Sequence, residues 1–161
     1  MKKVLYLHGL ESNQGGKKVD FLANEFCVHA PAMDYTNPML QNQVEFMMRQ
    51  FNPDIIIGSS MGGYVASILA RQYGKPAILF NPAFHNRSFD PSISNFIPNE
   101  DDILQDRKIV VLGKNDDVIP SYITKIMLEN NRNYKIVLEE MGHQVPLPIF
   151  IDTINNYKNE L

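Results

Sequence analysis

Residues 55–57 are three consecutive isoleucines, and a stretch of helical periodicity begins four residues after the last of them. A short continuous apolar run is typical of a strand that is buried on both faces of a parallel sheet. The helical stretch covers 61–73 and stops before Gly74, a residue type that favours helix C-termini. Because parallel strands are joined by crossovers that are usually helices, this pairing predicts a sheet packed against helices.

The same alternation of short β-branched runs and longer helical stretches continues along the chain. It predicts an α/β fold with three layers, in which helices cover both faces of a minimal parallel sheet. The expected order of the six strands is 2-1-3-4-5-6, so that strands one and three meet at the topological switch point. The strands are predicted at 3–8, 26–30, 54–59, 77–81, 108–112 and 135–139.

Three further helices are predicted from the same periodicity. Asn37 as N-cap and Pro38 at the first helical position start one of them. The second covers 121–130, and the third runs from about 147 to 158. In the second helix, the spacing predicts a packed apolar face formed by Ile123, Ile126 and Met127.

The length of 161 residues fits one hydrophobic core, and we expect a single domain over 1–161. The interval 83–106 departs from the alternation, because it joins two strands without a clear long helix. Connections of this length are usually functional or mobile. We interpret the interval as a short cap or lid segment, with a pair of short packing helices as the alternative.

The net charge of −3 limits the classes of partner, because no broad basic surface for nucleic acid is expected. No stretch approaches the roughly twenty apolar residues that cross a bilayer. The start of the chain is basic, but its apolar run is too short for a signal peptide. Cys27 is the only cysteine, which excludes an internal disulfide, and it is expected to be buried. We therefore expect a cytoplasmic protein without nucleic-acid or membrane partners.

The sequence Gly58-Ser59-Ser60-Met61-Gly62 matches G-x-S-x-G where the predicted central strand joins its helix. This pattern is typical of a nucleophile elbow, in which a serine occupies a strained strand-to-helix turn. The two glycines lack β-carbons and let strand and helix approach each other. Ser60 is therefore the candidate nucleophile, and Ser59 is interpreted as its structural neighbour.

A serine hydroxyl needs a base to take its proton and a carboxylate to orient that base. His143 lies just past the last predicted strand, where a loop can direct an imidazole across the C-terminal edge of the sheet. Asp116 follows the fifth strand at the same edge and is the candidate acid, with Asp117 as the alternative. Asn81 ends the fourth strand, but it carries no charge and cannot replace the acid.

A tetrahedral acyl-transfer intermediate carries an oxyanion that needs two fixed hydrogen-bond donors. The backbone N–H of Met61, directly after the candidate nucleophile, is predicted to be one of them. The backbone N–H of Leu10, in the loop after the first strand, is predicted to be the other. The histidines are scattered and none has metal-ligand spacing, so neither a metal nor another cofactor is expected.

Four motifs in this order resemble those of small bacterial esterases, a minimal and uncharacterised group within the α/β-hydrolase superfamily. They lie at 5–12, 58–63, 80–83 and 142–143 and together span nearly the whole chain. The resemblance implies an α/β-hydrolase fold and carboxylester hydrolysis without a cofactor. Compared with larger relatives, the chain lacks the first two strands and a long lid, which argues against large lipid substrates.

These features predict a serine carboxylesterase that cleaves small to medium acyl esters through an acyl-enzyme. The expected partner is a small-molecule acyl ester, while the oligomeric state stays open. A thioesterase or an acyltransferase with the same triad is one alternative, because a thioester fits the same chemistry. A non-catalytic binding module that keeps the fold is another.

Overall fold

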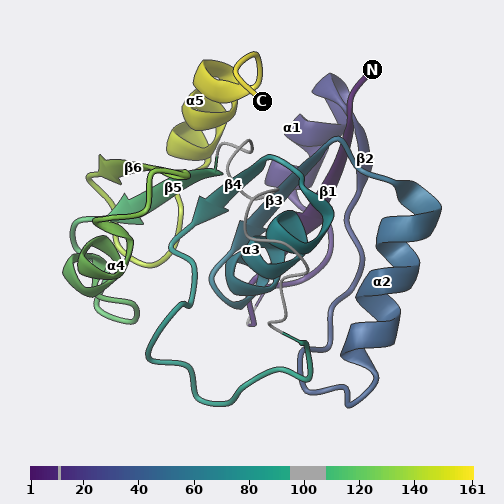
Figure 1. Ribbon diagram of the computed structural model, residues 1–161. Coiled ribbons are helices and arrows are strands. Elements are labelled where there is room, and N and C mark those ends of the chain that lie inside the picture. Colours follow the sequence, from purple (N-terminus) through teal and green to yellow (C-terminus); the bar gives the residue numbers. More distant parts are fainter. Residues whose placement is uncertain (11, 95–107) are drawn as a thin grey trace.

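The computed structural model describes residues 1–10, 12–94 and 108–161. Within these ranges, six parallel strands form one sheet in the order β2-β1-β3-β4-β5-β6 (Figure 1). The predicted fold class and strand order are confirmed. The strands are β1 (Lys3–Leu7), β2 (Cys27–His29), β3 (Ile55–Ser59), β4 (Ala77–Phe80), β5 (Lys108–Gly113) and β6 (Tyr134–Glu139).

Helices cover both faces of the sheet, as Figure 1 shows. The two apolar clusters assign α1 and α5 to one face and α2, α3 and α4 to the other. Among the described residues, no helix combines the length and the apolar character needed to cross a membrane. The helices are α1 (Lys17–Glu25), α2 (Leu40–Phe51), α3 (Met61–Tyr73), α4 (Ser121–Leu128) and α5 (Leu147–Tyr157).

The isoleucine run forms the centre of the sheet in β3. Ile55 and Ile57 pack in the cluster beneath α1 and α5, whereas Ile56 packs in the cluster beneath α2 and α3. Successive side chains of a strand point to opposite faces, so a strand with helices on both sides needs apolar residues without interruption. Burying each isoleucine contributes about 1.5–3 kcal/mol. The run therefore fixes β3 between β1 and β4.

The predicted start of α2 is two residues too early, because the helix begins at Leu40 rather than at Pro38. The Asn37 Oδ1 accepts the backbone N–H of Met39 at 2.9 Å, so this bond lies ahead of the helix rather than at an N–H within it. The carbonyl of Asn37 also accepts the N–H of Leu40 at 3.1 Å. Asn37 and Pro38 thus form a turn that precedes the helix, a competing use of the same residue types. The helix itself begins at Leu40.

Two predicted burials are also wrong. Cys27 is exposed, because it lies at the start of β2, the edge strand next to β1. In α4, the side chains of Ile126 and Met127 are 67% and 52% exposed, while Thr124 and Leu128 are buried. The helix is therefore rotated relative to the face predicted from its apolar residues.

The predicted cap is described only in part, since 95–106 lies outside the described residues. The part that is described, 83–94, has no helix. It is tied to α2, because Ser92 accepts the backbone N–H of Gln41 at 3.1 Å and the Gln41 side chain accepts the N–H of Ser94 at 2.7 Å. Three of its apolar residues pack against the core cluster of α2 and α3, namely Phe84, Phe89 and Ile93.

Candidate active site

Ser60 lies between β3 and α3 with φ 55° and ψ −121°, a conformation that residues other than glycine rarely adopt. Backbone hydrogen bonds hold this strained turn in place. The N–H of Ser60 donates to the carbonyl of Phe80 at 2.9 Å, and its carbonyl accepts the N–H of Ala83 at 3.0 Å. Strand β4 and the residues after it therefore fix the position of the candidate nucleophile.

The two glycines of the elbow are required by close approach of the backbone. A β-carbon on Gly62 would overlap the carbonyl groups of Leu7 and His8, and one on Gly58 would overlap the carbonyl of Gly62. Because these obstacles are backbone atoms, rotation of a side chain could not relieve them. The spacing of the motif is thus the condition for packing α3 against β1 and β3.

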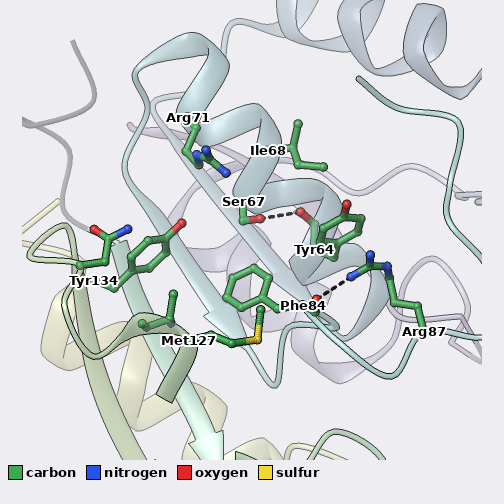
Figure 2. A pocket seen from close by; sticks show the side chains of 10 residues that line it. Tyr64, Ser67, Ile68, Arg71, Phe84, Arg87, Met127 and Tyr134 are labelled. Atoms are coloured by element: carbon green, nitrogen blue, oxygen red, sulfur yellow. Dashed lines mark hydrogen bonds between the residues drawn. The ribbon is translucent and has the colours of Figure 1, made fainter. Parts of the chain in front are cut away.

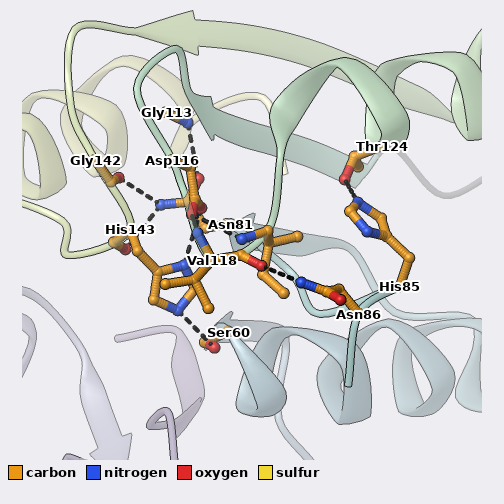
Figure 3. Close-up of polar contacts among 11 residues, drawn as sticks. Ser60, Asn81, His85, Asn86, Gly113, Asp116, Val118, Thr124, Gly142 and His143 are labelled. Carbon is orange, nitrogen blue, oxygen red and sulfur yellow. Dashed lines mark hydrogen bonds and ion pairs between the residues drawn. The ribbon is translucent and has the colours of Figure 1, made fainter. Parts of the chain in front are cut away.

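Figure 3 shows the side chains of Ser60, His143 and Asp116 in one connected series. His143 Nε2 lies 2.9 Å from Ser60 Oγ, and His143 Nδ1 lies 2.9 Å from Asp116 Oδ2. A carboxylate only accepts hydrogen bonds, so Nδ1 carries the proton and Nε2 is the acceptor for the serine hydroxyl. The fold brings these groups together although 83 residues separate the serine from the histidine.

The Asp116 side chain is fully buried, and both of its oxygens have partners. Oδ1 accepts the backbone N–H groups of Val118 at 2.9 Å and Ile119 at 2.8 Å. Burial raises the pKa of this carboxyl. Hydrogen bonds from His143 and from the two amides, together with the charge of His143, lower the pKa by more than burial raises it. The pKa of Asp116 therefore lies below its ordinary value. The alternative acid, Asp117, is exposed, and it is Asp116 that faces the imidazole.

The lowered pKa of Asp116 predicts a contribution to stability that depends on pH. In the unfolded chain the pKa of an aspartate is about 3.9, so the stabilisation is complete above that value and is lost as the pH falls through the lower folded value. We expect Asp116→Asn to be less stable than the wild type at neutral pH, with a difference that shrinks below about pH 4. Urea unfolding at a series of pH values measures this difference. A difference that stays constant through the acid range would contradict the expectation.

The loop after β1 passes beside the candidate nucleophile. A β-carbon on Gly9 would lie 3.3 Å from the β-carbon of Ser60. Leu10 follows in the same loop, with a side chain that is 45% exposed, and Met61 begins α3 directly after Ser60. Both predicted oxyanion donors therefore belong to segments that border Ser60, and their donor role stays a prediction.

Two other histidines pair with groups outside the triad. His8 is buried, and its Nδ1 donates to the carbonyl of Gly9 at 2.7 Å while its Nε2 accepts the N–H of Met33 at 3.0 Å. His85 lies 3.0 Å from the hydroxyl of Thr124 through its Nε2. Across the described ranges, no three His, Cys, Asp or Glu side chains are grouped so that they could hold a metal ion.

Asn81 belongs to the site through side-chain hydrogen bonds that the sequence did not predict, because Asn81 was considered there only as a replacement for the acid. Its side chain is buried against the backbone of the loop that carries His143 (Figure 3). The available signal is the dipeptide Asn81-Pro82 directly after a buried strand, because such a pair favours a turn rather than a continued strand. That signal places Asn81 at the C-terminal edge of the sheet but does not reveal its partners.

A separate cavity of about 280 Å³ lies along α3 and is lined by side chains from α3, the segment after β4, α4 and the start of β6 (Figure 2). The guanidinium of Arg87 lies 4.0 Å from the centre of the Tyr64 ring at its wall. Arg87 donates to the carbonyls of Ala83 and Phe84 at 2.9 and 2.7 Å. The Arg87 guanidinium therefore holds the segment after β4 in place. The residues that line the cavity include none of the triad.

The model of an uncharacterised protein family, UPF0227, matches residues 3–102 of the chain. This match covers more than half of the sequence. The chain belongs to the UPF0227 family. The matched region contains the elbow with Ser60 and the loop after β1, and it ends before Asp116 and His143.

Solved structures share the architecture of this UPF0227 protein at low sequence identity. A member of the α/β hydrolase superfamily from Xanthomonas campestris pv. campestris has 17% identity and a TM-score of 0.73, with 100% of both chains covered. A thermophilic esterase from Thermogutta terrifontis has 15% identity and a TM-score of 0.68, covering 99% of this chain and 89% of its own. A monoacylglycerol lipase from Paleococcus ferrophilus has 13% identity and a TM-score of 0.70, covering 98% and 92%. At these identities the likeness establishes the fold, so the predicted α/β-hydrolase fold is confirmed.

Proposed function

We propose that this UPF0227 protein is a serine hydrolase, and within that class a carboxylesterase for small to medium acyl esters. The observation that carries the proposal is the hydrogen-bonded series from Ser60 Oγ through the imidazole of His143 to the carboxylate of Asp116. The imidazole is held in the tautomer whose Nε2 can accept the hydroxyl proton. A hydroxyl, a base and an orienting acid in this order are what acyl transfer requires.

The reaction begins when Ser60 Oγ attacks the ester carbonyl carbon while His143 Nε2 takes the hydroxyl proton. The oxyanion that forms would accept hydrogen bonds from the backbone N–H groups of Met61 and Leu10. The imidazolium then gives its proton to the leaving alcohol, the carbon–oxygen bond breaks, and an acyl-enzyme remains. Asp116 stays ionised throughout, which its lowered pKa supports.

Water completes the cycle by attacking the acyl-enzyme, with His143 again taking a proton. The acid product leaves, and the proton on the imidazole returns to Ser60 Oγ. A thioester could follow the same route with a thiol as the leaving group. Transfer of the acyl group to an acceptor other than water would use the same first half, and analysis of the products would distinguish the two outcomes.

The exposed side chains around the triad favour an apolar acyl group. Leu10, in the loop after β1 that passes Ser60, and Val118, two residues after Asp116, are 45% and 46% exposed. Leaving such side chains in water gains nothing for folding, whereas covering them with an acyl chain removes apolar surface from water. We therefore propose esters with an uncharged, apolar acyl group as substrates, rather than esters whose acyl group carries a charge.

A fluorophosphonate probe tests the proposed nucleophile directly, because its phosphorus reacts with an activated serine. We expect the probe to modify the intact protein once and mass spectrometry to locate the adduct on Ser60 rather than on Ser59. Short p-nitrophenyl esters should be hydrolysed, and labelling should abolish that hydrolysis. A folded protein that neither reacts with the probe nor cleaves such esters would refute the proposal and favour the binding module.

A further inference from the structure

Asn81 occupies a position that is unusual both in its backbone and in its burial. It directly follows β4 with a φ of 42°, in the left-handed region, and its side chain is 1% exposed. Its backbone N–H donates to the carbonyl of Val111 in β5 at 2.8 Å. A polar amide in such surroundings is costly unless it is fully hydrogen-bonded.

The side-chain amide of Asn81 meets that requirement through two different loops. Nδ2 donates to the carbonyl of His143 at 2.9 Å and to the carbonyl of Gly142 at 3.1 Å, and Oδ1 accepts the N–H of Gly113 at 2.8 Å. Figure 3 shows these contacts beside the triad. The partners fix the orientation of the amide, because its oxygen faces a donor and its nitrogen faces two acceptors.

These partners belong to the segments that carry the acid and the base. Gly113 ends β5, and its carbonyl accepts the N–H of Asp116 at 3.2 Å, so it begins the turn that holds the acid. The carbonyls of Gly142 and His143 belong to the loop after β6 that holds the base. Asn81 therefore reaches from β4 past β5 and ties the loop of His143 to the start of the loop of Asp116.

We propose that Asn81 is a positioning residue that holds the His143 imidazole in line between Ser60 and Asp116. The inference rests on the proposed hydrolase function for its kinetic consequence, although the geometry stands without it. The backbone of β4 already fixes Ser60 through Phe80 and Ala83. The end of this one strand thus sets both the nucleophile and the loop of its base, and a displacement of about 1 Å between such groups can cost about 10²-fold in rate.

The variant Asn81→Gly removes the amide and keeps a residue that adopts positive φ without strain. Asn52→Gly is the matched control, because Asn52 has a φ of 46° at the end of α2 and is not a partner of the triad loops. We expect Asn81→Gly to lower kcat about tenfold to a hundredfold with KM unchanged, and the control to keep the wild-type kcat. We also expect the low-field proton resonance of His143 Nδ1–H, hydrogen-bonded to Asp116, to be lost or broadened in Asn81→Gly alone.

A second variant, Asn81→Asp, separates the two halves of the contact. It preserves the shape of the side chain and the acceptor for Gly113, but it replaces the donor to Gly142 and His143. We expect Asn81→Asp to lose the Nδ1–H resonance as well, and to lower kcat at least as much as Asn81→Gly does. If either variant folds and keeps the wild-type kcat and resonance, the positioning role is wrong. If both fail to fold while Asn52→Gly folds, the role is also refuted, because Asn81 would then serve the fold as a whole.

The resonance separates this inference from the proposed function. A wild-type protein that shows no ester hydrolysis refutes the esterase, but the Nδ1–H signal still reports whether Asn81 holds the imidazole against Asp116. Conversely, an active enzyme whose resonance and kcat survive in Asn81→Gly refutes only the positioning role. The two proposals therefore fail by different observations.

Discussion

Replacing Ser60 by alanine is expected to lower the kcat for a short p-nitrophenyl ester by about 10⁶-fold. The change removes the hydroxyl oxygen that is proposed to form the acyl-enzyme, and the water that remains would have to attack the ester without covalent assistance. Ser60 is held by backbone contacts to Phe80 and Ala83, and these do not involve its hydroxyl. The fold should therefore survive, and circular dichroism and thermal unfolding of the variant check that it does.

Ser59→Ala is the control for this variant. Ser59 is the last residue of β3 and precedes the strained turn, so its hydroxyl is not the one that His143 contacts. We expect Ser59→Ala to retain turnover close to that of the wild type. Equal losses in the two variants would show that damage to the elbow, rather than removal of the nucleophile, explains the effect.

The Asp116→Asn variant is expected to lower kcat by about 10⁴-fold, the size of the effect in comparable triads. An asparagine amide would present a donor to Nδ1 of His143, which favours the tautomer with the proton on Nε2. That nitrogen would then face Ser60 with a proton of its own and could not act as the base. Measuring kcat at neutral pH, on protein shown to be folded, tests this reasoning.

Asp117→Asn is the comparison that decides between the two acids considered from the sequence. Asp117 is exposed, whereas the carboxylate of Asp116 is 2.9 Å from Nδ1. We expect the Asp117 variant to change kcat less than about twofold, because Asp116 rather than Asp117 contacts the imidazole and an exposed substitution should leave the fold stable. A large loss in Asp117→Asn with little loss in Asp116→Asn would reverse the assignment of the acid.

The features of the fold that sequence predicted well depend on strong local patterns. The three isoleucines of β3 predict a doubly buried strand because each face of the sheet is covered. Gly58 and Gly62 predict the elbow because backbone atoms occupy the space of any β-carbon. The crossover rule for parallel strands restricts the possible topologies, and the observed strand order is one that is typical of doubly wound sheets.

The features that were predicted badly from the sequence depend on tertiary contacts. Ile126 and Met127 have the spacing of a core face, yet α4 turns them toward solvent. Asn37 has the chemistry of an N-cap and is used in a turn instead. The hydrogen-bond partners of the Asn81 side chain lie 32 to 62 residues further along the chain, so no local pattern could name them.

The strands that carry Ser60 and His143 differ in burial, and this difference affects how the protein would lose activity. Ser60 follows β3, whose apolar residues are almost entirely shielded, whereas His143 follows β6, an edge strand that is only partly shielded along its length. Edge segments open at lower free energy than central ones. Local unfolding of β6 would move the His143 imidazole away from Ser60 while the centre of the sheet stayed folded. Catalytic activity would therefore be lost before the global fold. The side-chain amide of Asn81, at the end of β4, opposes this local unfolding because it holds the loop after β6 to the interior of the sheet.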